Sequence, residues 1–499
     1  MQFIRSIFDR SPYQLAIISG VLIGCAYPPF PGVTAWVGFM PLIHIWLTQP
    51  PKESARWTFF AGVISHIIAF YWIGLNSGAS IIAAFFSMTA SILYLSAIWA
   101  VFGWGMATIE KRFGNSIAIM PFAWASLEWL RAFGPLGFPW ANLAITQTKF
   151  LPLVQITDTT GSEGVAFWLI LLNILVYLTI RSSGDLGTQK KVLALAFILP
   201  WIFGAFRIYQ FDSAEVKEVR SVAAIQPNVN PNQKWEASFR DRLYTIMDSL
   251  NAEAYSMDPD LVLWPEAALP AYMRVSSSRL KYEWLVNDTK IPLAMGTVDY
   301  DRDSTGRRVY NGTIFFGING NKMYHKIFLV PFAEYIPMSP WFPALKKLNF
   351  GQANFTHGDE FTTFPLDSVY FSNIICYEST HPTVARGFMN NGARFLTIEA
   401  NDAWLRNSSG VRQHFELARL RAVEQRVGII RSANTGISGL IQPSGRVDQK
   451  IKFGDQAVFL GEVILNQGVT FYGRYGSVFA QMCFILNLIQ IVWLIRRQK

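Results

Sequence analysis

The sequence predicts two joined parts: an α-helical polytopic membrane domain of about eight transmembrane helices, and a layered α/β domain outside the membrane. The first observation is composition. The 499-residue chain is 51% hydrophobic and 15% charged, whereas ordinary soluble domains hold about 25% charged residues. The second is the absence of Asp, Glu, Lys and Arg from 11–51 and 57–109. The third is a change of pattern near Asp212, where short β-rich runs begin.

Long apolar stretches predict the transmembrane helices, because about 20 helical residues cross a hydrocarbon core. The first stretch is long for a signal-peptide core and has no small-residue cleavage pattern, so we expect it to be retained. Seven stretches precede the polar region and one follows it, at about 12–27, 33–49, 57–75, 80–109, 114–131, 163–180, 192–208 and 475–495. The predicted parts are a seven-helix transmembrane domain at 1–211, an external domain at 212–473, and a C-terminal transmembrane helix with a cytoplasmic tail at 474–499.

Clusters of Lys and Arg predict the orientation. They lie before the first stretch, between the second and third, between the fourth and fifth, between the sixth and seventh, and after the eighth. Because cationic loops favour the cytoplasm, both termini are expected there and residues 212–473 outside. In a bacterium this is the periplasmic face of the inner membrane. These loops also explain the net charge of +9; no basic helix with interleaved aromatics suggests nucleic-acid binding.

The external region has the pattern of one α/β domain. Nine β-rich runs bounded by Gly, Pro and Asn predict strands at 219–229, 260–264, 293–300, 312–318, 369–375, 394–398, 428–433, 439–442 and 458–464. Apolar residues at helical spacing predict helices at 233–257 and 409–427. Strands that alternate with helices indicate a layered fold around one core.

The three cysteines form no disulfide framework and no metal-ligand spacing, and we expect neither a metal nor another cofactor. Cys25 and Cys483 lie in apolar stretches, where a cysteine is usually a small hydrophobic side chain. Cys376 instead ends an apolar strand. A buried structural role is the default for such a residue, and a nucleophilic role requires a nearby base or cation, since little thiolate exists at neutral pH.

Two other residues occupy similar positions. Glu266 follows a predicted strand in an apolar setting that suits a general base, although a surface carboxylate after a turn is the simpler explanation. Lys326 lies in the stretch 324–332, which is otherwise apolar and predicts a strand, where the lysine either snorkels at a sheet edge or holds an oxyanion. Each structural explanation suffices alone. Three such residues, each at a strand end or in a strand, favour a shared site.

These three segments resemble the nitrilase superfamily, whose active site uses Glu, Lys and Cys in that chain order. With the membrane stretches included, nearly the whole chain resembles the apolipoprotein N-acyltransferase family. Further matching stretches are Gly137–Trp140, Gln226–Asn228, Lys234-Trp235, Pro331-Phe332, Glu334–Pro337, Tyr377-Glu378, Asn401–Trp404, Gln413-His414, Arg419–Glu424 and Arg431–Gly436. One departure is Leu405-Arg406, where the family more often has Phe-Gly, and the shape of that loop stays open.

The resemblance implies an αββα nitrilase-type sandwich and a ping-pong acyl transfer. Glu266 would deprotonate Cys376, which would take a fatty acyl chain from a membrane phospholipid as a thioester. The chain would then pass to the α-amino group of the N-terminal diacylglyceryl-cysteine of a lipoprotein. Lys326 would stabilise the oxyanion together with backbone N–H groups near residue 377, and Glu334 would orient Lys326.

The resemblance also assigns Trp235, Tyr377 and Glu378 to substrate binding or site integrity. His325, His381 and His414 have no place in a Glu–Lys–Cys scheme, and we expect structural roles for them.

Some alternatives stay open. Glu128 and Arg131 share a helix face, where they form a structural ion pair or meet a lipid phosphate. Residues 345–354 form either a flap over the site or an ordinary surface loop.

Two other functions share some of these features. A membrane-tethered amidase would use the same three residues but would need only one span. A transporter or receptor would place charged or broken helices at the membrane midplane, whereas these stretches are nearly free of charge.

Overall fold

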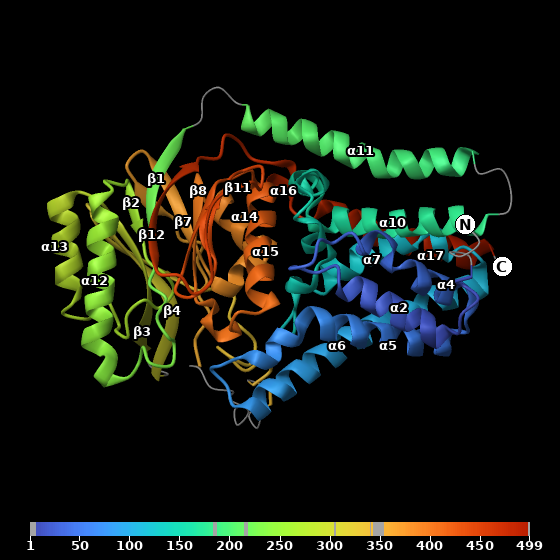
Figure 1. Cartoon of the computed structure of the whole chain (residues 1–499), viewed down its shortest axis with the longest axis horizontal. Coiled ribbons are helices and arrows are strands. Elements are labelled where there is room, and N and C mark those ends of the chain that lie inside the picture. The colour runs from blue at the N-terminus through green and yellow to red at the C-terminus, as the bar shows by residue number, and fades with distance from the viewer. Residues whose placement is uncertain are drawn as a thin grey trace.

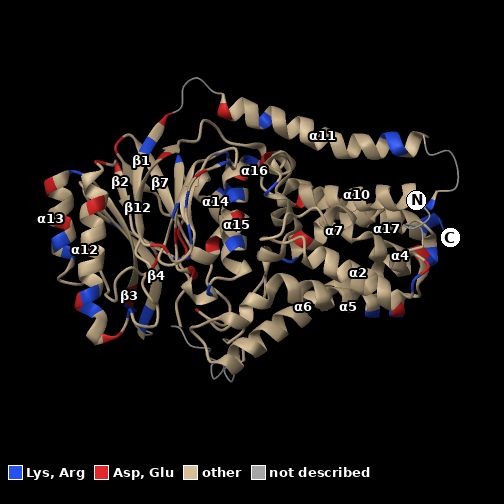
Figure 2. Cartoon of the chain, viewed as in Figure 1, with Lys and Arg blue, Asp and Glu red and all other residues tan. Residues whose placement is uncertain are grey.

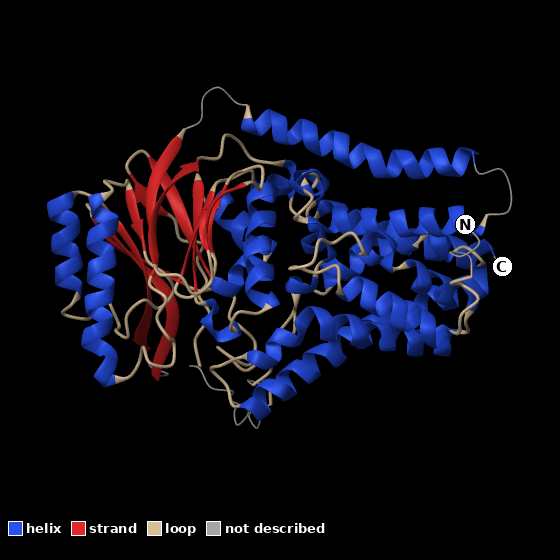
Figure 3. Ribbon diagram, in the orientation of Figure 1, coloured by secondary structure: helices blue, strands red, loops and turns tan. Residues whose placement is uncertain are grey.

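The computed structural model describes residues 6–182, 187–213, 218–303, 306–339, 341–342 and 354–497. A bundle of helices forms one half of the elongated molecule, and two β-sheets with their covering helices form the other (Figure 3). Both termini lie at the far end of the bundle, away from the sheets (Figure 1). Most of the proposed flap at 345–354 falls outside the described residues.

Five helical segments among the described residues are long and apolar enough to cross a membrane: Pro51–Leu75, which contains α5 (Pro51–Phe70), α6 (Ile81–Phe113), α10 (Ser162–Arg181), α11 (Gly187–Asp212) and α17 (Val478–Arg497). Three of the predicted spans correspond to shorter helices. These are α2 (Pro12–Gly24), the pair α3 (Ala35–Gly38) and α4 (Met40–Thr48), and α7 (Met120–Leu130). Pro41 and Pro121 lie in the first turns of α4 and α7, where a missing N–H is tolerated.

Small residues bring the helices of the bundle close together. A Cβ on Gly20 of α2 would lie 2.8 Å from the Cβ of Ile64 in α5, and one on Gly24 would lie 2.8 Å from the Cβ of Ile68. Only glycine permits this close approach. Small residues commonly mediate helix packing in membranes, because the hydrophobic effect does not drive helices together in lipid. By contrast, α11 runs along the edge of the bundle (Figure 1), and only Gly204 among its residues is buried.

The two sheets each have six strands, in the orders β12-β1-β2-β3-β4-β5 and β11-β10-β9-β8-β7-β6. The strand bounds are β1 Val219–Gln226, β2 Leu261–Leu263, β3 Leu293–Asp303, β4 Gly306–Gly317, β5 Gly320–His325, β6 Phe364–Leu366, β7 Val369–Ile375, β8 Phe395–Ala400, β9 Ile429–Ala433, β10 Ser438–Ile441, β11 Val447–Ile451 and β12 Ala457–Ile464. The central pairs are parallel: β1 with β2, β2 with β3, β7 with β8 and β8 with β9. Central parallel strands are buried on both faces, which explains their near-continuous apolar runs.

Helices cover the outer faces of the sheets (Figure 1). α12 (Arg240–Ser256) and α13 (Arg279–Thr289) lie over the first sheet, and α14 (Pro382–Asn390) and α15 (Ser409–Gln425) lie between the second sheet and the bundle. An apolar core fills the space between the sheets, with side chains that include Leu263, Phe315, Ile374, Ile398 and Ile430. The two-sheet fold agrees with the layered α/β domain that the sequence predicts.

All nine predicted strands are present; β4 begins at Gly306, six residues earlier than predicted, and the other ends differ by at most three residues. The strands β5, β6 and β11 and the helices α13 and α14 are not predicted from the sequence. Lys326 was expected inside a strand, which is wrong: β5 ends at His325 and the chain then turns. The predicted helix at 233–257 begins only at Arg240, because turns occupy 231–235.

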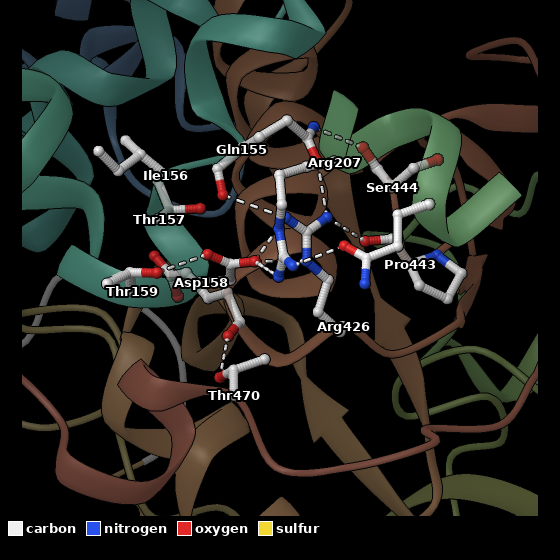
Figure 4. A network of polar contacts seen from close by, with 12 residues as sticks. Gln155, Ile156, Thr157, Asp158, Thr159, Arg207, Arg426, Pro443, Ser444 and Thr470 are labelled. Atoms are coloured by element: carbon white, nitrogen blue, oxygen red, sulfur yellow. Dashed lines mark hydrogen bonds and ion pairs between the residues drawn. The ribbon is translucent and has the colours of Figure 1, made fainter. Parts of the chain in front are cut away.

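A buried network joins the bundle to the second sheet (Figure 4). Arg426, which caps α15 in a left-handed conformation, donates to Asp158 at 2.7 and 2.9 Å and to the Gln155 side chain at 2.6 Å. Arg207 of α11 pairs with the same Asp158 carboxylate. Because Asp158 belongs to the short helix α9 (Thr157–Thr160), this network links α9, α11 and α15.

Charge is distributed unevenly over the molecule. The helices of the bundle are nearly free of charged residues along their middle, and Lys and Arg gather at the end that holds both termini (Figure 2). Glu128 and Arg131 form a buried pair with 3.9 Å between Oε1 and Nη2. Glu128 also accepts hydrogen bonds from Trp124 and from the backbone of Leu143, so it ties α7 to the segment that follows.

Candidate active site

Strand ends place the three predicted catalytic residues. Glu266 lies three residues beyond β2, Lys326 directly follows β5, and Cys376 directly follows β7. Cys376 has φ +51°, a left-handed conformation that is uncommon for residues other than glycine and concentrates at functional sites. The first two residues come from one sheet and the third from the other, so the site lies where loops of the two sheets meet.

Lys326 is held between two carboxylates. Its Nζ lies 2.9 and 2.8 Å from the two oxygens of Glu334 and 3.8 Å from Oε1 of Glu266. All three side chains are buried. Glu334 also accepts a hydrogen bond from the Val330 backbone at 2.7 Å, so the short turn after Lys326 fixes the position of its partner. The ammonium has three N–H donors, and the hydrogen bonds within the described residues use two.

Asn311 is a site residue that the sequence analysis missed. Its side-chain Nδ2 donates to Glu266 at 2.8 Å and to Glu334 at 3.0 Å, and its backbone carbonyl accepts from the Lys326 backbone at 2.9 Å. The side chain of Asn311 therefore bridges both carboxylates, while its backbone fixes the start of the segment that carries Lys326. Asn311 lies one residue before the predicted strand, which begins at Gly312. A polar residue next to an apolar strand was the only local signal for it.

Burial and neighbouring charge set the protonation states. Burial disfavours the charged form of Lys326, but the carboxylates of Glu334 and Glu266 outweigh it and raise the pKa of the ammonium. Burial, reinforced by the Glu266 charge, raises the pKa of the Cys376 thiol well above its ordinary value, against the lowering effect of Lys326. The site therefore holds a cation and a neutral thiol at neutral pH. A base that takes the thiol proton during attack suits this arrangement.

Glu378 connects the two sheets. Its Oε1 accepts from the Tyr324 hydroxyl at 2.7 Å and from the backbone of Ile327 and Phe328 at 2.7 and 3.1 Å. Its Oε2 accepts from the Ile375 backbone at 2.9 Å. The carboxylate is fully buried and all these bonds are internal, so it holds the segment after Lys326 against the strand that ends at Cys376.

Tyr377 faces the membrane half. Its ring lies 6.5 Å from that of Trp140 at an interplanar angle of 25°, and its hydroxyl lies 3.5 Å from the Gly137 carbonyl oxygen. The residue after the predicted nucleophile is therefore covered by the segment between α7 and α10.

Trp235 stands apart from this cluster and is 53% exposed. The preceding residue, Lys234, is buried, and its ammonium donates to the Ala267 carbonyl at 2.6 Å. Burial lowers the pKa of Lys234 to about 8, while Glu266 acts to raise it. The structure thus brings the lysine of this pair next to Glu266 and leaves the tryptophan at the surface.

One group of side chains has spacing that suits a metal. Ligand atoms of Cys376, Asp402 and His414 lie within 4.8 Å of one another. Asp402 and His414 are already bonded to each other at 2.7 Å, and the Arg431 guanidinium lies 2.7 Å from Asp402 and 3.0 Å from His414. A buried guanidinium at this distance repels a cation, so the arrangement favours hydrogen bonding over metal binding.

Comparisons with known proteins match the two halves separately and together. A family model described as "Apolipoprotein N-acyltransferase N-terminal domain" matches residues 19–175, and one described as "Carbon-nitrogen hydrolase" matches residues 221–466. A relative from Geobacter metallireducens named "Apolipoprotein N-acyltransferase" is 32% identical over 95% of this chain and 94% of its own length. A relative of the same name from Chlorobaculum tepidum is 28% identical over 98% of this chain and 97% of its own length. A solved NitN amidase is 16% identical, with a TM-score of 0.37 over 51% of this chain and 96% of its own.

Proposed function

The chain belongs to the apolipoprotein N-acyltransferase family and is a membrane enzyme that N-acylates lipoproteins, and we propose that Cys376 carries the acyl chain between two lipid substrates. The observation that supports this most is the buried Lys326, which bonds Glu334 through two N–H groups and keeps a third for a reacting oxygen. The acyl donor in this proposal is a membrane phospholipid. The acceptor is the α-amino group of an N-terminal diacylglyceryl-cysteine.

In the first half-reaction the Cys376 sulfur attacks an ester carbonyl of the phospholipid. Glu266 takes the thiol proton as the S–C bond forms, because the thiol is neutral at rest. Lys326 and the backbone N–H of Tyr377 stabilise the oxyanion. When the tetrahedral intermediate collapses, the ester C–O bond breaks, the leaving oxygen takes the proton from Glu266, and lysophospholipid departs.

In the second half-reaction the neutral α-amine attacks the thioester carbonyl. Glu266 accepts a proton from the attacking nitrogen, and the same donors hold the second oxyanion. Collapse breaks the C–S bond, returns the proton to sulfur and leaves an amide on the lipoprotein. The thiol is then ready for another phospholipid.

The remaining predicted residues support these steps. Glu334 orients Lys326 through its two hydrogen bonds, and Glu378 maintains the contact between the two strand ends. Tyr377 supplies an oxyanion donor from its backbone. Trp235, which is exposed, offers an aromatic face to a substrate at the surface of the domain.

We further propose eight transmembrane segments around an external αββα domain. Residues 1–211 supply seven spans, 212–473 form the catalytic domain, and 474–499 supply the last span and a cytoplasmic tail. The gathering of Lys and Arg at the end with both termini supports a cytoplasmic position for that end (Figure 2). The catalytic domain then lies on the periplasmic face of the bacterial inner membrane, where it meets lipid substrates at the bilayer surface.

Replacing Cys376 tests the chemistry. Mass spectrometry of lipoprotein N-termini from cells whose only source of this activity is Cys376→Ala should find free α-amines, because no other group can carry the acyl chain. The matched control is Cys483→Ala, which removes a buried thiol of α17 and should leave the amines acylated. Fully acylated amines in cells with Cys376→Ala would rule out the mechanism.

Reporter fusions test the orientation. A reporter that is active only outside the cytoplasm should work when fused after residue 210 and fail at the C-terminus. Equal activity at both positions would contradict the eight-span arrangement.

A further inference from the structure

The carbonyl group of Cys376 is held by two donors. Its oxygen lies 2.9 Å from Nε2 of His414 and accepts from the Ser379 hydroxyl at 2.9 Å. In a planar trans peptide the C=O of one residue and the N–H of the next point in opposite directions. Holding the carbonyl of Cys376 therefore determines where the N–H of Tyr377 points.

His414 is itself held in place by Asp402 and Arg431. Its Nδ1 lies 2.7 Å from Oδ1 of Asp402, and the other carboxylate oxygen accepts from Arg431 at 2.7 Å. All three side chains are at most 1% exposed. Burial would raise the pKa of Asp402, but the charges of Arg431 and His414 outweigh it and lower the pKa, which keeps the carboxylate ionised. Nε2 faces the Cys376 carbonyl, and Nδ1 faces Asp402 and the Arg431 guanidinium, which lies 3.0 Å away, so contacts at both ring nitrogens fix the orientation of the imidazole.

The membrane half covers the same ring. Trp140, from the short turn between α7 and α10, lies over His414 with centroids 5.2 Å apart at 31°. Its Nε1 donates to Gln413 at 2.9 Å, and the Gln413 amide donates to the Ala69 carbonyl at 2.9 Å and the Pro28 carbonyl at 3.2 Å. The first turn of α15 is therefore bonded to the outer ends of the membrane helices.

We propose that His414 is a positioning residue that aims the Tyr377 N–H at the reacting oxyanion through its hydrogen bond to the Cys376 carbonyl. The inference rests on the proposed function, because it assumes that Cys376 forms a tetrahedral intermediate. The bond also polarises the peptide, which makes the N–H a stronger donor. Trp140 and Gln413 connect this peptide to the membrane helices, so the bundle helps to complete the oxyanion site.

The same contacts exclude a role for His414 as the general base. A ring nitrogen lies within 4.8 Å of the Cys376 sulfur, but Nε2 faces the carbonyl oxygen of Cys376 and Nδ1 faces Asp402. Because a carbonyl oxygen only accepts hydrogen bonds, Nε2 carries a hydrogen and cannot take one from the thiol. Its influence on the reaction therefore passes through the peptide.

Two reactions of Cys376 separate this role from a general structural one. Acylation by phospholipid passes through an oxyanion, whereas alkylation by iodoacetamide does not. Both rates are measured on the purified full-length enzyme, the first in mixed micelles of dipalmitoyl phosphatidylethanolamine and phosphatidylglycerol. The variants are His414→Asn, whose amide reaches only as far as Nδ1, and His414→Gln, whose longer side chain carries an N–H to the position of Nε2. His44→Asn, which removes an imidazole bonded to Tyr177 in the bundle, is the control.

We expect His414→Asn to acylate about tenfold to 100-fold more slowly, since loss of an oxyanion donor costs about 100-fold or more. Its alkylation rate should stay within about threefold, His414→Gln should recover most of the acylation rate, and His44→Asn should match the wild type. Unchanged acylation in His414→Asn, equal loss of both reactions, or equal acylation losses in the two His414 variants would each overturn the inference. Failure of the wild-type enzyme to acylate Cys376 would instead refute the proposed function.

Discussion

Two buried clusters of charge differ in how their hydrogen-bond donors are used: the junction network around Arg426, at the C-terminal end of α15, and the site cluster around Lys326. In the junction network Arg426 directs its guanidinium to Asp158, Gln155 and backbone carbonyls, and Arg207 shares the same carboxylate (Figure 4). In the site cluster Lys326 lies between two carboxylates, and its hydrogen bonds to described residues use two of its three N–H groups. Beside it lies the neutral thiol of Cys376, whose backbone is left-handed.

This difference suits the junction network to a structural role and the site cluster to a reactive one. A buried ion pair contributes little net stability over apolar packing, but removal of one partner costs several kcal/mol. The junction network therefore keeps its three elements in place only if it remains complete. The site cluster gathers a cation, two carboxylates and a thiol, and in the proposed acyl transfer the remaining N–H of Lys326 donates to the reacting oxygen.

The largest effect is expected at the site. Lys326→Met should lower acyl transfer about 1,000-fold, because the oxyanion loses its cationic donor. Turnover of a diacylglyceryl peptide by purified enzyme measures this loss. Lys322→Met, which removes an exposed lysine bonded to the Thr363 carbonyl, is the control and should retain full activity. If Lys326→Met kept a rate within tenfold of the wild type, the site cluster would not differ from the junction network in its role.

Substitutions in the junction network should lower the stability of the protein and leave the rate of acyl transfer unchanged. Arg426→Met leaves Asp158 with Arg207 alone, and we expect a loss of about 3–5 kcal/mol in the free energy of unfolding. The rate per folded molecule should stay near that of the wild type. Asp448→Asn, at the exposed 2.7 Å pair with Arg446, should cost less than about 1 kcal/mol. If Arg426→Met instead lowered turnover without lowering stability, the junction would belong to the site.

Asn311 tests how strongly the site depends on its bridging amide. Asn311→Ala removes the donor shared by Glu266 and Glu334, and we expect turnover to fall about tenfold, since each carboxylate keeps its lysine partner. Asn321→Ala, at an exposed amide bonded to Glu283, should leave turnover unchanged. An Asn311→Ala enzyme with full activity would show that the lysine alone positions both carboxylates.

The pH dependence of thiol reactivity provides the finest comparison. Burial raises the pKa of Cys376, so the thiol remains protonated at neutral pH and loses its proton only at alkaline pH. Alkylation of Cys376 by iodoacetamide should therefore keep rising as the pH increases to about 9, without levelling off. A small reference thiol measured in parallel should approach its plateau in that range. A plateau for Cys376 near pH 7 would mean that the site stores a thiolate.

Local patterns predicted the strand ends that carry Glu266 and Cys376, because a buried strand that stops at a polar residue is visible in a short window, but they placed Lys326 inside a strand and not after one. They did not predict the residues that complete the site. Asn311 lies 45 residues from Glu266 and His414 lies 38 residues from Cys376, and such contacts depend on how the sheets and helices pack.

The junction network was even less predictable from local patterns, since Arg426 and Asp158 are 268 residues apart. The three-residue strand β6 is too short for a period of two to be recognised. Pro41 and Pro121 mark the starts of helices that the apolar runs alone suggested were longer.

The most direct test of the central claim is a search for the acyl-enzyme itself. Purified enzyme is incubated with phospholipid that carries a labelled acyl chain, in the absence of any acceptor, and the peptide containing Cys376 is analysed by mass spectrometry. We predict one acyl chain on Cys376, sensitive to hydroxylamine and discharged when a diacylglyceryl peptide is added. An unmodified Cys376 in enzyme that still transfers the labelled chain to that peptide would contradict the account.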